Sequence, residues 1–237
     1  RSSAASDVYK RQTIDIGLQD VAEDALYRAL QKHDAQWGTA IVMEVATGQI
    51  KAIANLKKTG EGKYDERYNY AVGNSCEPGS TFKLATMIAL LEDGHIDLND
   101  SVNLNNGHWK HHRKDIYDSE GWHPHKNVTA QFAFESSSNV GMAKLVHQHY
   151  KDNPKQFIER ILDMRLDETT GIEISGEGKP FIKTNPSDRN SWWGTTLAFM
   201  SFGYELELTP LQVLSLYNAV ANDCLLYTSD AADDRSC

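Results

Sequence analysis

Hydrophobic and polar positions alternate along the first quarter of this chain with two different periods, and each period predicts a different element. Within 13–34 the apolar residues recur at helical spacing, which predicts an extended start followed by a helix. Two runs rich in Ile, Val and Ala, 39–45 and 49–55, flank Ala46-Thr47-Gly48 and predict a β-hairpin. The apolar positions of the helix are Val21, Ala25, Leu26 and Ala29.

Farther along, helical patterns alternate with polar stretches that we predict to be loops. Glu77-Pro78-Gly79-Ser80 opens a helix that Asp93-Gly94 closes. Thr209-Pro210 supplies an N-cap and a first-turn proline for a last helix. The predicted helices are 81–91, 128–150 with an interruption at 136–139, 154–164 and 211–221, and the predicted irregular segments are 56–74, 103–127 and 171–193.

Both ends of the chain are predicted to be foreign to the domain, on the basis of the genetic code. Residues 3–12 read SAASDVYKRQ, which TCG GCA GCG TCA GAT GTG TAT AAG AGA CAG encodes. The opposite strand, shifted by one base, translates as CLLYTSDAA, which is the sequence of residues 224–232. The pair resembles a sequencing-library adapter translated from both ends of one DNA fragment. We therefore predict adapter-derived residues at 1–12 and 224–237 and a partial domain over 13–223.

Composition and charge mainly exclude certain classes of protein. The chain is 40% hydrophobic and 24% charged, as in ordinary globular proteins. No apolar run reaches the about 18 residues of a membrane-spanning helix, and we find no signal peptide, so any anchor is expected upstream. The excluded ends hold four basic and four acidic residues, so the net charge stays at −9, which argues against nucleic-acid binding. Cys76 alone remains of three cysteines and is interpreted as a packed thiol.

The sequence Ser80-Thr81-Phe82-Lys83 is the clearest chemical feature. On a helix, Lys83 lies three residues beyond Ser80 and on the same face. A serine hydroxyl becomes a good nucleophile when a base removes its proton, and a lysine of lowered pKa can be that base. The helix N-terminus also favours negative charge that develops on a reacting oxygen. The pattern therefore predicts a nucleophile and its base.

The surroundings of this tetrapeptide carry a family resemblance. Residues 77–83, Glu-Pro-Gly-Ser-Thr-Phe-Lys, resemble the nucleophile motif of class B penicillin-binding proteins, which we take to be of the division type. Ser137-Ser138-Asn139, followed by Val140-Gly141, is similar to the second motif of that family, S-x-N, and begins 57 residues after Ser80. Residues 13–19, 38–54 and 204–218 resemble other parts of the same domain, so the resemblance covers nearly all of 13–223.

The resemblance implies a fold and a role for each motif residue. The fold is α/β, the transpeptidase fold shared with serine β-lactamases, in which helices flank an antiparallel sheet whose C-terminal strands are expected to be missing here. Ser80 would be the acylated nucleophile and Lys83 its base. Ser137 would relay a proton to the leaving amine, and Asn139 would bind the substrate backbone. The family needs no metal and no cofactor.

The implied activity is that of a peptidoglycan D,D-transpeptidase, which cross-links stem peptides ending in D-Ala-D-Ala and is acylated by β-lactams. Such an enzyme acts at the extracytoplasmic face of the bacterial cytoplasmic membrane, with cell-wall synthesis and division proteins as partners of the full-length parent. Two alternatives stay open: a non-catalytic β-lactam sensor, and a serine D,D-carboxypeptidase or β-lactamase that uses water. We expect the printed chain to be inactive, because the third motif, K-[S/T]-G, should lie beyond Asp223.

Two further features match functional patterns and are interpreted as structural. Lys58-Thr59-Gly60 has the letters of the third motif, but it precedes Ser80 and its flanks have turn chemistry, so we interpret Lys58 as a solvated loop lysine outside the cleft. Five histidines within 18 residues, with Asp115 and Asp118 between them, lack the spacing of a zinc site and are interpreted as part of a packed surface loop. They are His108, His111, His112, His123 and His125.

Overall fold

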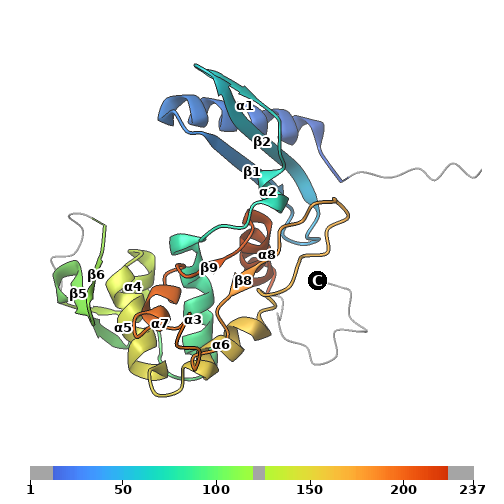
Figure 1. Cartoon of the computed structure of the whole chain (residues 1–237). Helices are drawn as coiled ribbons and strands as arrows, with labels where there is room; N and C mark the ends of the chain where they lie inside the picture. The colour runs from blue at the N-terminus through green and yellow to red at the C-terminus, as the bar shows by residue number, and fades with distance from the viewer. Residues whose placement is uncertain (1–12, 120–125, 224–237) are drawn as a thin grey trace, which may run out of the picture. The chain divides into compact units, whose positions relative to one another are not determined.

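The structure, a computed structural model, describes residues 13–119 and 126–223. The chain divides into two compact units, one ending at Tyr68 and the other beginning at Asn69 (Figure 1). Each unit is described by itself below. The two segments predicted to be adapter-derived lie outside the described residues. Within the described part, no helix is long and apolar enough to cross a membrane.

The first unit is a three-stranded antiparallel sheet with one helix packed along it (Figure 1). The strand order is β1-β2-β3, and the predicted hairpin is confirmed as the β1-β2 pair. The carboxylate of Asp15 caps the helix by accepting a hydrogen bond from the Leu18 N–H at 2.9 Å. Leu26 and Leu30 of the helix are buried against Ala54 of β2 and its neighbours. The elements are α1 (Ile16–His33), β1 (Trp37–Met43), β2 (Ile50–Gly60) and β3 (Lys63–Asp65).

The prediction of an irregular segment over 56–74 is wrong. The hydroxyl of buried Tyr64 lies within hydrogen-bond distance of the carbonyls of Leu30 and Ala35, at 2.9 and 3.0 Å, and so ties β3 to the end of α1. Lys58 pairs with Tyr64 in the β2-β3 ladder, and its ammonium forms an ion pair with Asp34. Lys58 is therefore a strand lysine rather than a solvated loop lysine. Its position outside the catalytic cleft stays a prediction.

The second unit is built around α3 (Lys83–Glu92), which a single 3-10 turn, η1 (Gly79–Phe82), precedes. Ala85, Ala89 and Leu90 of α3 are fully buried in the main core of this unit. The predicted helices are confirmed, including the interruption between α4 and α5. The helices in contact with α3 are α4 (Ala130–Glu135), α5 (Asn139–Tyr150) and α6 (Pro154–Asp163) (Figure 1). The unpredicted α7 (Thr196–Met200) contacts α5, and the unpredicted α2 (Tyr70–Gly73) contacts α8 (Pro210–Ala221).

The start of α8 shows why local sequence is informative at helix ends. The Thr209 hydroxyl accepts a hydrogen bond from the Gln212 N–H at 3.2 Å, and the Gln212 side chain accepts one from the Thr209 N–H at 2.9 Å. Pro210 occupies the first turn, where no N–H is needed. This reciprocal capping box satisfies two backbone donors within four residues. The predicted N-cap and first-turn proline of this helix are confirmed.

The prediction of irregular structure over 103–127 is also wrong for the described residues. Two antiparallel pairs occur there: β4 (Ser101–Asn103) with β7 (Asn127–Thr129), and β5 (His108–His111) with β6 (Lys114–Tyr117). Ile116, only 2% exposed, clusters with Val140 and Ala143 of α5. Packing against α5 therefore stabilises strands that their polar composition does not predict. A short 3-10 turn, η2 (Asn105–Gly107), lies between β4 and β5. The loop predicted over 171–193 is confirmed except for β8 (Phe181–Ile182), which pairs with β9 (Leu206–Glu207).

The segment that leads into η1 is held by a distant part of the chain. Cys76 and Leu208 exchange two backbone hydrogen bonds, at 3.1 and 2.9 Å. The Gly79 N–H donates to the Gly203 carbonyl at 3.0 Å. Gly203 has a φ of +85°, and a Cβ built there would lie 2.0 Å from the Gly79 carbonyl oxygen. Only glycine allows the two backbones to approach so closely.

We therefore expect Gly203→Ala to destabilise the second unit more than a glycine substitution in open space. Gly171→Ala is the matched control, because Gly171 also has a positive φ, +71°, but nothing lies within 4 Å of its added Cβ. The left-handed conformation alone costs about 1–2 kcal/mol, and the backbone clash should add about 1–3 kcal/mol. Thermal unfolding of the two variants of the full-length protein measures the difference. Equal melting temperatures would contradict it.

Candidate active site

Ser80 lies in η1, immediately before α3, and is exposed. Gly79, at a φ of +57°, turns the chain into η1, and the Thr81 hydroxyl donates to the Pro78 carbonyl at 2.8 Å. The Ser80 Oγ lies 3.1 Å from the Nζ of Lys83. The three-residue spacing thus places the hydroxyl and the amine on one face, as the sequence predicts.

Lys83 is the most buried charged side chain near this turn, with 1% of its surface exposed. Its Nζ lies within hydrogen-bond distance of three oxygens: the Ser80 Oγ at 3.1 Å, the Ser137 Oγ at 3.0 Å and the Ser137 carbonyl at 2.5 Å. An ammonium has three N–H donors, so this set of acceptors satisfies all of them. Lys83 is therefore the group that joins the two predicted motifs.

Burial lowers the pKa of Lys83 to about 8, because a low-polarity surrounding disfavours the charged ammonium. The carboxylate of Asp118 opposes this shift by stabilising the ammonium. A lysine with this pKa has a substantial neutral fraction near neutral pH, unlike an exposed lysine with a pKa of about 10.4. The site thus holds an amine that can accept a proton.

The second motif forms the turn between α4 and α5. Ser137 has a φ of +55°, a left-handed conformation that costs free energy for a residue with a side chain. In this conformation both its hydroxyl and its carbonyl point to the Nζ of Lys83. Ser138, fully buried, caps α5 by accepting a hydrogen bond from the Gly141 N–H at 2.8 Å. The motif therefore combines a strained turn with a capped helix start.

The end of β6 contacts the same turn. The Asn139 side-chain amide donates to the Tyr117 carbonyl at 2.9 Å, which uses one of its two N–H donors. Asp118 accepts hydrogen bonds from the Ser138 hydroxyl at 2.8 Å and from the Val140 N–H at 2.9 Å. Sequence reasoning associated Asp118 only with the neighbouring histidines and missed this contact. No signal in the sequence points to it, because 20 residues separate the two partners.

The histidines occupy different surroundings. His111 is buried, and the centroid of its ring lies 4.5 Å from the ring centroids of His112 and of His147. Burial lowers the pKa of His111 to about 4. His108 pairs with Asp115 at 2.8 Å. His123 and His125 lie outside the described residues. Over 13–119 and 126–223, no group of three or more His, Cys, Asp or Glu side chains is arranged to hold a metal ion.

Cys76 is half-buried and unpaired with any other cysteine of the described part. Burial is the main cause that raises the pKa of its thiol, with smaller contributions from Glu207 and Glu77. A raised pKa keeps the thiol protonated and poorly nucleophilic. This agrees with the interpretation of Cys76 as a packed thiol.

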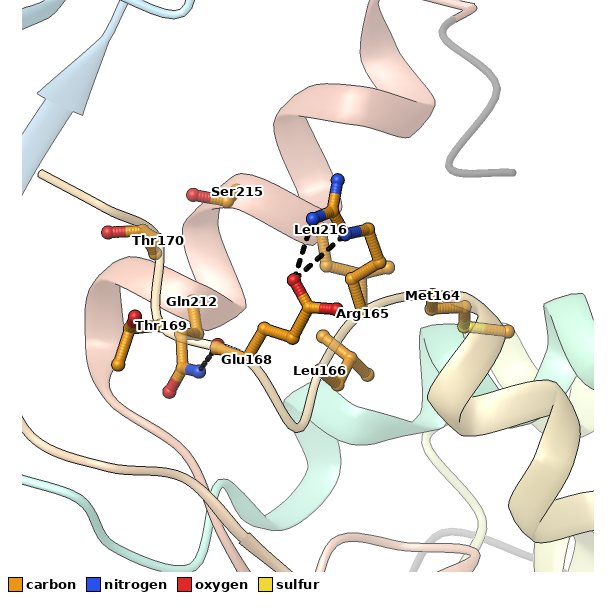
Figure 2. A pocket seen from close by; sticks show the side chains of 9 residues that line it. All are labelled: Met164, Arg165, Leu166, Glu168, Thr169, Thr170, Gln212, Ser215 and Leu216. Carbon is orange, nitrogen blue, oxygen red and sulfur yellow. Dashed lines mark hydrogen bonds and ion pairs between the residues drawn. The ribbon is translucent and has the colours of Figure 1, made fainter. Parts of the chain in front are cut away.

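A separate hollow of about 270 Å³ lies between the end of α6 and α8. Figure 2 shows that its charged side chains, Arg165 and Glu168, point toward each other, and their closest atoms lie 2.7 Å apart. The Gln212 amide donates to the Glu168 carbonyl at 2.6 Å. The two charged groups of this hollow thus satisfy each other, and none of the predicted site residues lines it.

Residues 38–229 match the family described as the penicillin binding protein transpeptidase domain. The chain belongs to this family. The match includes residues 224–229, so the boundary predicted at Asp223 stays a prediction. Family membership confirms the resemblance drawn from the two motifs.

Curated relatives agree with this assignment. The chain is 28% identical over 220 residues to the probable peptidoglycan D,D-transpeptidase PenA of Neisseria gonorrhoeae, covering 90% of this chain and 36% of that protein. It is 30% identical over 217 residues to the peptidoglycan D,D-transpeptidase FtsI of Buchnera aphidicola, covering 89% of this chain and 36% of that protein. The chain thus spans about a third of the length of these relatives.

Solved structures confirm the penicillin-binding protein fold. A peptidoglycan glycosyltransferase from Burkholderia ambifaria superposes with a TM-score of 0.76 at 24% identity, covering 94% of this chain and 67% of that one. The transpeptidase domain of Burkholderia pseudomallei penicillin-binding protein 3 superposes with a TM-score of 0.73 at 23% identity, covering 93% and 62%. The predicted α/β class, with helices and an antiparallel sheet, is therefore confirmed.

We expect the amine of Lys83 to titrate well below an ordinary lysine. Lys58 is the internal control, because its ion pair with Asp34 raises its pKa above the ordinary value. The measurement is an NMR titration of ¹³C-labelled lysine side chains in the full-length protein, with the Lys83 signal assigned from a Lys83→Arg variant. A midpoint near 8 is expected for Lys83. A midpoint at about 10.4 would contradict the effect of burial.

Proposed function

We propose that the full-length protein carrying this chain is a peptidoglycan D,D-transpeptidase that works through an acyl-enzyme on Ser80. The observation that carries the proposal is the contact of one buried amine, Lys83, with the hydroxyls of both Ser80 and Ser137. Two motifs that are 57 residues apart in the sequence thus share one proton-accepting group. Such a chain of hydroxyl, amine and hydroxyl is suited to moving a proton during acyl transfer.

The first step is attack of Ser80 on the penultimate D-Ala carbonyl of a stem peptide. In the neutral form of Lys83, two N–H groups can donate to the Ser137 carbonyl and hydroxyl, which leaves the nitrogen lone pair for the Ser80 O–H. With a pKa of about 8, about one molecule in ten is in this form at pH 7. The Ser80 proton passes to Lys83 as the oxygen–carbon bond forms.

The second half of acylation releases the terminal D-Ala. The proton on Lys83 passes to the Ser137 oxygen while the Ser137 proton passes to the leaving amine nitrogen, and the carbon–nitrogen bond breaks. The 3.0 Å contact between the Nζ and the Ser137 Oγ supports this relay. An amine of a neighbouring stem peptide then attacks the acyl-enzyme, its proton returns along the same path, and Ser80 is regenerated.

Substrate binding and location follow from the same proposal. Asn139, held by the Tyr117 carbonyl, offers its remaining amide groups to the backbone of the stem peptide. Peptides ending in D-Ala-D-Ala would be the substrates, and β-lactams would acylate Ser80. The relative in Neisseria gonorrhoeae is named a probable peptidoglycan D,D-transpeptidase, and the relative in Buchnera aphidicola a peptidoglycan D,D-transpeptidase. We accordingly propose an enzyme at the extracytoplasmic face of the cytoplasmic membrane, with partners in cell division.

Ser80→Ala in the full-length protein should abolish covalent labelling by a fluorescent penicillin. The reason is that no other group would carry the acyl bond. Ser215→Ala is the control, because the Ser215 hydroxyl only donates to the Leu211 carbonyl within α8, at 2.9 Å, and labelling should persist. Labelling is read from denaturing gels after each variant has been shown to fold. Persistent labelling of Ser80→Ala at another residue would refute the assignment of the nucleophile.

A second test separates transpeptidation from the alternatives. The full-length protein is mixed with a peptide ending in D-Ala-D-Ala and an excess of isotope-labelled D-alanine. Mass spectrometry should show labelled D-alanine exchanged into the peptide terminus, because an amine resolves the acyl-enzyme. Release of D-alanine without exchange would identify a carboxypeptidase, and a stable acyl-enzyme with penicillin but no peptide turnover would identify a sensor.

A further inference from the structure

We propose that Asp118, directly after β6, is a positioning residue that holds the Ser137 turn against Lys83. The inference rests on the function proposed above, because it concerns the geometry of the same site. Asp118 acts on the turn, whose left-handed residue, Ser137, must be held in place by other residues.

Asp118 contacts the turn with both of its carboxylate oxygens. One accepts a hydrogen bond from the Ser138 hydroxyl at 2.8 Å, and the other accepts one from the Val140 N–H at 2.9 Å. Two bonds from one planar group to neighbouring residues fix orientation as well as position. A carboxylate is also stabilised at this place, because the first N–H groups of α5 carry partial positive charge.

The end of β6 is itself firmly placed. The Asp118 N–H donates to the Gly107 carbonyl at 2.9 Å. Ile116, two residues earlier, is buried against α5. The neighbouring Tyr117 carbonyl accepts the hydrogen bond from Asn139. Tyr117, the last residue of β6, and Asp118 directly after it therefore contact three consecutive residues, 138–140, and support the whole turn.

The turn depends on such a support. A left-handed residue with a side chain costs about 1–3 kcal/mol and persists only where its surroundings determine it. Ser138, fully buried, donates its hydroxyl proton to Asp118 while accepting from the Gly141 N–H. Without the carboxylate this hydroxyl loses its acceptor, and the turn can relax toward an ordinary conformation. The Ser137 hydroxyl and carbonyl would then move away from Lys83.

Asp118 also acts on Lys83 through its charge. Among the described residues it is the carboxylate whose charge raises the pKa of Lys83, against the larger lowering by burial. Removing this charge lowers the pKa further, so the neutral amine forms at lower pH. The acid limb of the acylation rate against pH should therefore move to lower pH. A residue with a purely structural role would reduce the rate and leave this midpoint unchanged.

The experiment compares three variants of the full-length protein. Asp118→Asn removes the charge and replaces one of the two acceptor oxygens with an NH₂ group, so the side chain can no longer accept from both Ser138 and Val140. Ser138→Ala removes the hydrogen bond between Ser138 and Asp118 without a change of charge. Asp115→Asn removes a carboxylate of β6 that pairs with His108 instead. The rate of acylation by fluorescent penicillin is measured from pH 5 to 10, and folding is checked by thermal unfolding.

Asp118→Asn should lower the plateau rate by about tenfold to a hundredfold, the range for a small displacement of a catalytic group, and should move the acid limb to lower pH. Ser138→Ala should lower the plateau rate and leave the acid limb in place, and Asp115→Asn should change neither. If Asp118→Asn does not fold, Ser138→Ala decides, and an unchanged rate in that variant overturns the proposal.

The outcomes also separate this inference from the proposed function. Labelling of the wild type but not of Ser80→Ala, together with an unchanged rate and acid limb in Asp118→Asn, would leave the acyl-enzyme standing and reject Asp118 as a positioning residue. Absence of labelling in the folded wild type would reject the proposed function itself.

Discussion

A lysine side chain with 1% of its surface exposed needs a surrounding that compensates for the loss of water. In the second unit, three oxygens provide this compensation for Lys83: two hydroxyls and one carbonyl. Burial still lowers the pKa of the amine to about 8, because hydrogen bonds replace only part of the hydration free energy. The proposed chemistry and the packing of α3 therefore depend on the same side chain.

The three acceptors come from parts of the chain that have to be brought together. Ser80 is fixed by η1, which Gly79 and the close approach of Gly203 place at the start of α3. Ser137 is fixed by a left-handed turn between α4 and α5. The hairpin of β5 and β6 supports that turn, because Ile116 packs on α5 while Asp118 binds Ser138. The short, polar strands β5 and β6 thus stabilise the site, although their composition does not predict strands.

The two wrong predictions have a common physical cause. Both 56–74 and 103–127 are polar, and a polar stretch without periodicity predicts a loop. In each segment one or two buried residues tie a short strand to a helix: Tyr64 binds the end of α1 through its hydroxyl, and Ile116 packs against α5. Strands of three or four residues contribute too few positions for a period of two to be visible.

The sequence alone determined the features that depend on neighbouring residues. The spacing of Ser80 and Lys83 and the N-cap at Thr209 are local, because a helix fixes the geometry of residues three positions apart. The motif resemblance also predicted roles for Ser137 and Asn139, but only because they match the S-x-N motif of the family. The tertiary structure decided that the Ser137 carbonyl contacts Lys83, that Asp118 binds Ser138, and that Lys58 lies in a strand. The first two contacts join residues that are 54 and 20 positions apart, and packing rather than spacing brings them together. The strand position of Lys58 depends on its pairing with β3.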